Sequence, residues 1–138
     1  MKAYVSVSYS NRQSLNYVIA AITESLPGFS IEAFVFVDHY QFNIEDEKQM
    51  MQQAMVDIED SDFLIAETSY KAIGIGVEAG YAIAKGKPVI YMRQQYAAHS
   101  TTVSGISNYH IVYADAVDLK QQLTSVLSNI SKTLQQKK

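Results

Sequence analysis

Short strand-like segments alternate with longer segments of helical periodicity along this chain, and this alternation restricts the folds that it can adopt. One segment, Phe63–Ala66, is a continuous apolar run, which is typical of a strand buried on both faces of a parallel sheet. The others are rich in β-branched and aromatic residues. The predicted strands are Tyr4–Ser8, Ile31–Val37, Phe63–Ala66, Pro88–Met92 and Tyr109–Tyr113.

The segments between these strands have the apolar spacing of helices. In the first, apolar residues recur every three or four positions from Leu15 to Leu26, and Pro27 and Gly28 follow. Further helices are predicted at about 44–60, at about 76–84 and from about 115 onward, and a polar loop at 93–102. Strands and helices that alternate in this way form a parallel sheet. The predicted fold class is α/β, a flavodoxin-like doubly wound five-stranded parallel sheet of order 2-1-3-4-5 flanked by helices.

Length and composition narrow the class of protein. The chain has 138 residues, 48% of them hydrophobic and 18% charged, so we expect one globular domain at residues 1–134 and a frayed polar tail at 135–138. A net charge of −3 is not that of a nucleic-acid binder. The chain has no cysteine, its histidines lack metal-ligand spacing, and no apolar run reaches the ~20 residues of a membrane span. We expect a cytoplasmic protein without metal or cofactor and without nucleic-acid or membrane partners.

Three predicted loops should meet at the site of chemistry. Ligands of open parallel sheets bind beyond the carboxyl ends of the strands, where the strand order reverses. The loops there are 8–12, 38–40 and 67–76. Tyr9 could stack on a base, and the guanidinium of Arg12 suits a phosphate. The candidate binding residues of these loops are Ser8, Tyr9, Ser10, Arg12, Asp38, His39, Gly74 and Gly76, and the Asp38–His39 neighbours could either handle protons or form a solvated loop pair.

The last of these loops leads into a glycine-rich turn around one acid. In Gly74-Ile-Gly-Val-Glu-Ala-Gly80, the glycines allow close approach by a ligand, and Glu78 is predicted in the first turn of a helix. The positive end of the helix dipole would favour the ionised carboxylate there, and an ionised carboxylate can act as a nucleophile. In the alternative interpretation the glycines only let the helix pack on the sheet, and Glu78 is an ordinary helix-start acid.

Three segments of the chain resemble the nucleoside 2-deoxyribosyltransferase family, and most closely its 2'-deoxynucleoside 5'-phosphate N-hydrolases. They are Asp62-Phe-Leu-Ile-Ala-Glu67, Gly74-Ile-Gly-Val-Glu-Ala-Gly-Tyr-Ala82 and Gly86-Lys-Pro-Val-Ile90. The resemblance implies a homodimer or larger homo-oligomer that acts on a small-molecule nucleoside or nucleotide. It also implies hydrolysis, or base exchange, at the N-glycosidic bond, through a glutamate that forms a glycosyl ester.

The resemblance assigns roles to individual residues. Glu78 matches the nucleophile, and Tyr4 matches a tyrosine that lies near it. Ser8 matches a serine that helps to hold the 5' phosphate. Thr101 falls near a hydroxyl that reaches the phosphate from a neighbouring subunit.

Two positions depart from the family pattern. The second acid of the family is replaced by Ala54, and the serine before the glycines is replaced by Ala72. Asp57 lies three residues after Ala54 and on a similar helix face, so it could supply the missing carboxylate or be a solvated helix acid. Loss of such an acid typically lowers a rate by about 10²–10⁴-fold.

Two other functions therefore stay open from the sequence. The replacements at Ala54 and Ala72 favour a non-catalytic nucleotide-binding or sensing module of the same fold. The run from Tyr4 to Ser10 is similar to the opening strand of TIR domains, some of which cleave NAD.

Overall fold

A five-stranded parallel sheet forms the centre of the protein, as shown by a computed structural model that describes residues 1–136. The strand order is β2-β1-β3-β4-β5 and all four pairings are parallel, so the predicted fold class is confirmed. The strands are β1 (Lys2–Ser6), β2 (Glu32–Val35), β3 (Phe63–Glu67), β4 (Val89–Gln94) and β5 (Tyr109–Tyr113).

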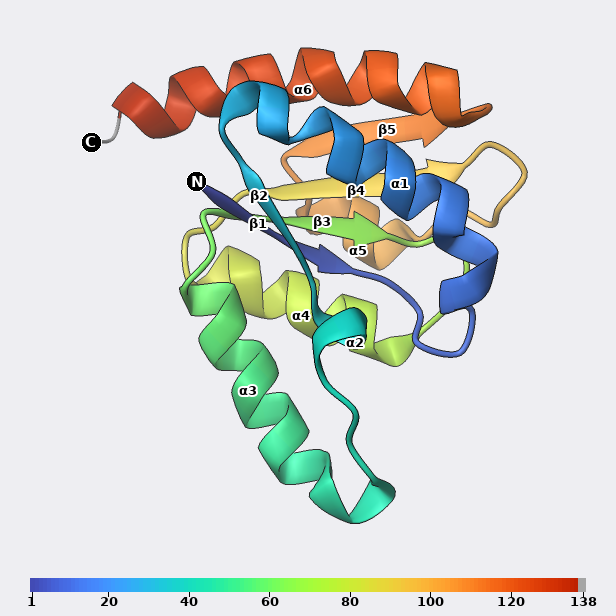
Figure 1. Ribbon diagram of the computed structural model, residues 1–138, viewed down its shortest axis with the longest axis vertical. Coiled ribbons are helices and arrows are strands. Elements are labelled where there is room, and N and C mark those ends of the chain that lie inside the picture. Colours follow the sequence, from blue (N-terminus) through green and yellow to red (C-terminus); the bar gives the residue numbers. More distant parts are fainter. Residues whose placement is uncertain (137–138) are drawn as a thin grey trace.

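Helices cover both faces of this sheet (Figure 1). One face is covered by α1 (Asn16–Ser25) and α6 (Ala116–Gln136), and the other by α3 (Glu47–Glu59), α4 (Ile73–Ala84) and α5 (Thr101–Ile106). The short elements are α2 (Phe36–His39) and the 3-10 turns η1 (Arg12–Leu15), η2 (Pro27–Phe29) and η3 (Ile44–Asp46). Within residues 1–136, no helix combines the length and the hydropathy that crossing a bilayer requires.

The alternation of side chains along β1 divides the core into two parts. Ala3 and Val5 pack in the core beneath α1 and α6, whereas Tyr4 packs in the core beneath α3 and α4. Ser6 shares the face of Tyr4, because side chains two positions apart point to the same side of a strand. The face of β1 that is covered by α3 and α4 therefore carries polar groups into the protein interior.

The structure differs from the sequence prediction at several boundaries. The second strand ends at Val35, where its pairing with β1 ends, and the chain turns into α2. The predicted loop at 93–102 begins as strand, and α5 starts at Thr101, a helix of six residues that is too short to show a period. Helix α6 continues through Gln136, past the predicted domain end at 134, and residues 137–138 lie outside the described residues.

Candidate active site

A cavity of about 470 Å³ lies beyond the carboxyl ends of β1 and β2, where the strand order reverses. Its walls come from the segment after β1, from α2 and the chain that follows it, and from the start of α4. Glu78 reaches this cavity from α4. The lining residues are Val7–Asn11, Phe36, Val37, Tyr40, Phe42, Met50, Met51, Lys71, Ala72, Gly74, Ile75 and Glu78.

The carboxylate of Glu78 is held by one hydrogen bond from the sheet. The Ser6 hydroxyl donates to Oε2 of Glu78 at 2.8 Å. Burial raises the pKa of Glu78 to about 7, although the Ser6 hydrogen bond and the neighbouring Tyr4 hydroxyl act in the opposite direction. A carboxylic acid with this pKa is partly ionised at neutral pH and can act as a nucleophile or exchange a proton.

The position of Glu78 corrects the prediction made from the helix dipole. Helix α4 begins at Ile73, so Glu78 lies in the second turn and not in the first. The dipole effect falls off within the first turn, and desolvation determines the direction of the pKa shift. The carboxylate is therefore less acidic than a solvated glutamate.

Ser6 is a site residue that the sequence analysis missed. Ser6 is 2% exposed, and within residues 1–136 its hydroxyl forms a hydrogen bond with Glu78 and with no other group. A signal was present, because Ser6 lies midway between Tyr4 and Ser8 and shares their strand face.

Tyr4 and Asp57 lie behind the cavity wall, in the core between the sheet and α3. The Tyr4 hydroxyl is buried without a hydrogen-bond partner, and burial, the charge of Glu78 and the charge of Asp57 all raise the pKa of Tyr4. Asp57 is 6% exposed, accepts from Gln53 Nε2 at 3.1 Å, and keeps its other carboxylate oxygen without a partner. The structure thus brings Glu78, Tyr4 and Asp57 close together. The sequence analysis expected Tyr4 near Glu78 and left the place of Asp57 open, and the burial of Asp57 shows that it is not a solvated helix acid.

The charge of Asp57 affects one residue of the cavity lining, Tyr40. Partial burial and the Asp57 charge raise the pKa of Tyr40, whose side chain lines the cavity. Tyr40 also packs against Phe36 and Phe42, with ring centroids 5.0 and 5.6 Å apart respectively. Together with Met50 and Met51, these rings form the apolar part of the cavity lining.

The first loop supplies the polar wall of the cavity. Ser8, Tyr9, Ser10 and Gly74 all line the cavity as predicted. The Ser8 hydroxyl is 3% exposed and donates to Asn11 Oδ1 at 3.0 Å, which fixes the turn of the loop.

Arg12, Asp38 and His39 do not line this cavity. Arg12 donates from Nε and Nη2 to the two carboxylate oxygens of Asp38, each at 2.8 Å, and so joins the first loop to α2. The His39 ring stacks on Phe34, at 4.3 Å between centroids, and its Nδ1 lies 2.9 Å from the Val35 carbonyl oxygen. Their predicted role in ligand binding therefore has no direct contact to support it.

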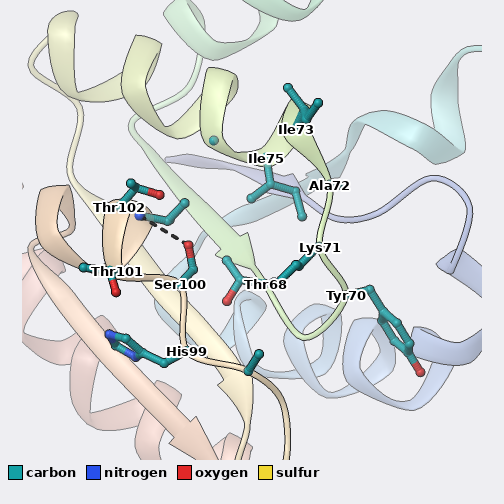
Figure 2. A pocket seen from close by; sticks show the side chains of 13 residues that line it. Thr68, Tyr70, Lys71, Ala72, Ile73, Ile75, His99, Ser100, Thr101 and Thr102 are labelled. Carbon is teal, nitrogen blue, oxygen red and sulfur yellow. Dashed lines mark hydrogen bonds between the residues drawn. The ribbon is translucent and has the colours of Figure 1, made fainter.

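Gly76 and Thr101 lie in a second cavity, of about 560 Å³, which Figure 2 shows. The side chains of Thr68, Ser100 and Ile75 gather at its centre, whereas Tyr70 and Ile73 point away from it. The segment 71–75 separates the two cavities, because Lys71, Ala72 and Ile75 line both.

Lys71 is a second residue that the sequence analysis missed. It is the cationic side chain that lines the Glu78 cavity, and within residues 1–136 it takes part in no ion pair. No sequence pattern distinguishes it from other exposed lysines. Over the same described part of the chain, no group of three or more His, Cys, Asp or Glu side chains is placed to hold a metal ion.

Comparison with known proteins identifies relatives of this chain. The family model for nucleoside 2-deoxyribosyltransferases matches residues 8–125. A curated relative from Thermofilum pendens, named for 2'-deoxynucleoside 5'-phosphate N-hydrolase activity, is 36% identical over 75 residues. That match covers 51% of this chain and 52% of the relative, so it spans about half the length of each.

Solved structures with similar folds include two enzymes of nucleoside and nucleotide chemistry. One is a 2-deoxyribosyltransferase from Bacillus psychrosaccharolyticus, with a TM-score of 0.67, 18% identity, and coverage of 92% of this chain and 96% of that one. The other is the CMP N-glycosidase BcmB from Clostridium botulinum, with a TM-score of 0.62, 19% identity, and coverage of 89% and 98%. At these identities the likeness establishes the shared fold.

The raised pKa of Glu78 predicts how stability depends on pH. The folded state binds the Glu78 proton more tightly than the unfolded state, whose pKa is near 4.5, so the wild type loses stability as pH rises from about 4.5 to about 7. Glu78→Gln, which carries no charge, should therefore unfold at higher urea concentration than the wild type at about pH 8 and not at about pH 4.

Urea denaturation across this pH range measures the difference in unfolding free energy. The matched control is Glu59→Gln, because Glu59 is an exposed carboxylate whose pKa is lowered by Lys85 and Tyr81, so its loss should give no gain at about pH 8. An equal effect of the two substitutions at every pH would contradict the assignment of a desolvated Glu78.

Proposed function

Because this chain belongs to the nucleoside 2-deoxyribosyltransferase family, we propose that it is an enzyme that cleaves the N-glycosidic bond of a deoxynucleoside or a deoxynucleoside 5'-monophosphate, with Glu78 as nucleophile. The observation that carries the proposal is the half-buried carboxylate of Glu78, held by Ser6 and open to a cavity large enough for a nucleotide. The family match spans residues 8–125, so it includes Glu78 and every residue of the cavity lining except Val7, whereas Ser6 on β1 lies just before it.

The proposed reaction proceeds in two steps. An ionised Glu78 oxygen attacks the anomeric carbon, the bond from this carbon to the base nitrogen breaks, and the base leaves with the bonding electrons and takes up a proton. A glycosyl ester of Glu78 results. Water, or a second base, then attacks the same carbon and releases Glu78 as a carboxylate, which gives hydrolysis or base exchange respectively with retained configuration.

The two walls of the cavity fit the two ends of such a substrate. The apolar wall of Phe36, Tyr40 and Phe42 can stack against a base. The polar part of the lining offers the Ser8 and Ser10 side chains and the cationic Lys71, which suit a 5' phosphate. A deoxynucleoside 5'-monophosphate would use both walls, whereas a nucleoside would leave the cationic end empty.

We propose that Asp57 takes the place of the family's second acid, whose position is occupied by Ala54. Asp57 lies deeper in the protein than the residues of the cavity lining. It does not line the cavity, and its charge acts on Tyr40, which does. We therefore assign Asp57 the role of holding the Tyr40 hydroxyl, which gives its proton to the leaving base and recovers one from the water, or the second base, that attacks in the second step.

Thr101 is proposed to act in a neighbouring subunit of a homodimer or larger homo-oligomer. In its own chain, Thr101 lines the second cavity and is separated from Glu78 by the segment 71–75. A hydroxyl in this place can reach a Glu78 cavity only if that cavity belongs to another copy.

The proposed function predicts that the protein releases free base from a nucleoside or nucleotide. Purified protein should release base from at least one member of a panel of deoxynucleosides, deoxynucleoside 5'-monophosphates, ribonucleotides and NAD, as followed by chromatography. Glu78→Ala should lower this release by at least about 10³-fold, because it removes the nucleophile, and the Glu59→Gln control should retain it. Saturable binding of a nucleotide without any release of base would contradict the proposed reaction and favour a sensing module. Release of nicotinamide from NAD, with no base released from the other compounds, would show that NAD and not a deoxynucleotide is the substrate.

The second prediction concerns Asp57. Asp57→Asn keeps the shape of the side chain and the contact with Gln53, but it removes the charge near Tyr40. We expect kcat for base release to fall by about 10²-fold, with substrate still bound. Tyr40→Phe should lower kcat by a similar factor, and the double variant should add little, because both substitutions interrupt one path. Wild-type kcat in Asp57→Asn would exclude Asp57 from the reaction.

The third prediction tests whether Thr101 acts across subunits. Thr101→Ala and Glu78→Ala, each impaired alone, are mixed under conditions that exchange subunits. In a dimer, mixed pairs contain one complete site, so base release should recover to about a quarter of the wild-type rate. A mixture that gives only the sum of the two separate rates would contradict a contribution from the partner.

A further inference from the structure

A fully buried glutamate, Glu67, lies on the opposite face of the sheet from Glu78. Glu67 is the last residue of β3, it is 0% exposed, and it faces the core beneath α1 and α6. The proposed reaction does not use it, since it lines neither cavity. A fully buried carboxylate is unfavourable for folding unless it is well hydrogen-bonded, so its presence calls for a reason.

Glu67 uses both of its oxygens to fix the chain around it. The Tyr113 hydroxyl on β5 donates to Oε2 at 2.6 Å, and the Ser69 backbone N–H donates to Oε1 at 2.6 Å. Burial raises the pKa of Glu67, while the bonds from Ser69 and Tyr113 oppose this shift. Two short hydrogen bonds from neutral donors suit a carboxylate that stays ionised.

The residues that follow Glu67 are attached to β4 at several points. The Thr68 N–H and hydroxyl both donate to the Met92 carbonyl oxygen, at 2.8 and 3.0 Å. The Gln94 N–H donates to the Ser69 hydroxyl oxygen at 2.8 Å. Glu67 closes this set of bonds, because within residues 1–136 it is the side chain that links the Ser69 backbone to β5.

The loop fixed in this way leads directly to the wall between the two cavities. Two residues after Ser69 the chain reaches Lys71, and then Ala72 and Gly74, all of which line the Glu78 cavity. Figure 2 shows how this loop runs from Thr68 through Tyr70 and Lys71 to the start of α4. A change in the direction of the loop at Ser69 would therefore move the cationic end of the proposed substrate site.

We propose that Glu67 is a positioning residue, which fixes the loop 68–72 from the opposite face of the sheet and thereby places Lys71 and Gly74 against the substrate. The proposal rests on the function proposed above. It assigns to a fully buried carboxylate a task that an apolar side chain of similar size could not perform, because only an acceptor can hold the Ser69 N–H in this turn. Stability and substrate binding should then respond differently to its removal.

The experiment replaces both partners of the buried bond at once. The double variant Glu67→Leu/Tyr113→Phe removes the carboxylate together with the hydroxyl, so no charge and no hydroxyl is left unpaired, and such paired replacements are often neutral for stability. The Ser69 N–H loses its acceptor, but Ser69 is half-buried and the N–H can bind water once the loop moves. We expect an unfolding free energy close to that of the wild type, a KM for base release raised about tenfold, and a kcat within about threefold. Amide hydrogen exchange should become faster at residues 69–72 and stay unchanged in α6.

Two further variants separate positioning from general stability. Glu67→Gln keeps an acceptor for the Ser69 N–H and should recover most of the wild-type KM. Leu127→Ala, in α6 and in the same core, should lower the unfolding free energy without raising KM or altering exchange at 69–72.

The outcomes distinguish the two proposals. Unchanged KM and unchanged loop exchange in the double variant would overturn the role of Glu67, as would a KM that rises equally in Leu127→Ala. If the wild type releases no base from any substrate, the proposed function fails, and the role of Glu67 is then decided by loop exchange and by the affinity for a deoxynucleoside 5'-monophosphate. Faster exchange with weaker binding would still support it, and no change in either would refute it.

Discussion

The parallel pairing of β1 with β2 on one side and β3 on the other is the constraint on which the rest of the structure depends. The chain adds β2 on one side of β1 and then crosses over to add β3 on the other side. The segments that follow these three parallel strands therefore converge at one edge of the sheet. The same pairing buries residues 3–6 of β1, whose side chains belong either to the core or to the candidate site. Ser6 and Glu78, 72 positions apart in the chain, meet there at 2.8 Å.

Desolvation then determines the chemical character of both buried glutamates. Glu78 has one strong hydroxyl donor and an adjacent cavity, so burial leaves it with a pKa near neutrality. Glu67 has two short bonds and no access to either cavity, so it is suited to holding backbone and not to reacting. The sheet separates these carboxylates, so the proposed nucleophile lies on one face and the proposed positioning acid on the other.

The sequence was sufficient for the topology and for the centre of the site, and insufficient for contacts made by folding. Alternating periods predicted the strand order, and the glycine-flanked acid together with the family resemblance predicted Glu78 and Tyr4. The start of α4 was placed too late, because packing of Ile75 and Ala79 on the sheet outweighs the low helix propensity of Gly74 and Gly76. The capture of Arg12 by Asp38 and the exposure of Lys71 at two cavities depend on where distant segments meet, and no local pattern records this.

The contact between β1 and α4 also determines when, during folding, Glu78 acquires its raised pKa. Helix α4 can form locally, but the Ser6–Glu78 bond requires the first and the middle thirds of the chain to dock, and contacts of such long sequence separation form late and slowly. In a chain whose first strand has not docked, Glu78 would be solvated and would have the ordinary pKa of a glutamate, near 4.5, with no enclosed cavity around it. The raised pKa of this carboxylate is thus a property of the finished tertiary structure, and a partly assembled chain would lack it.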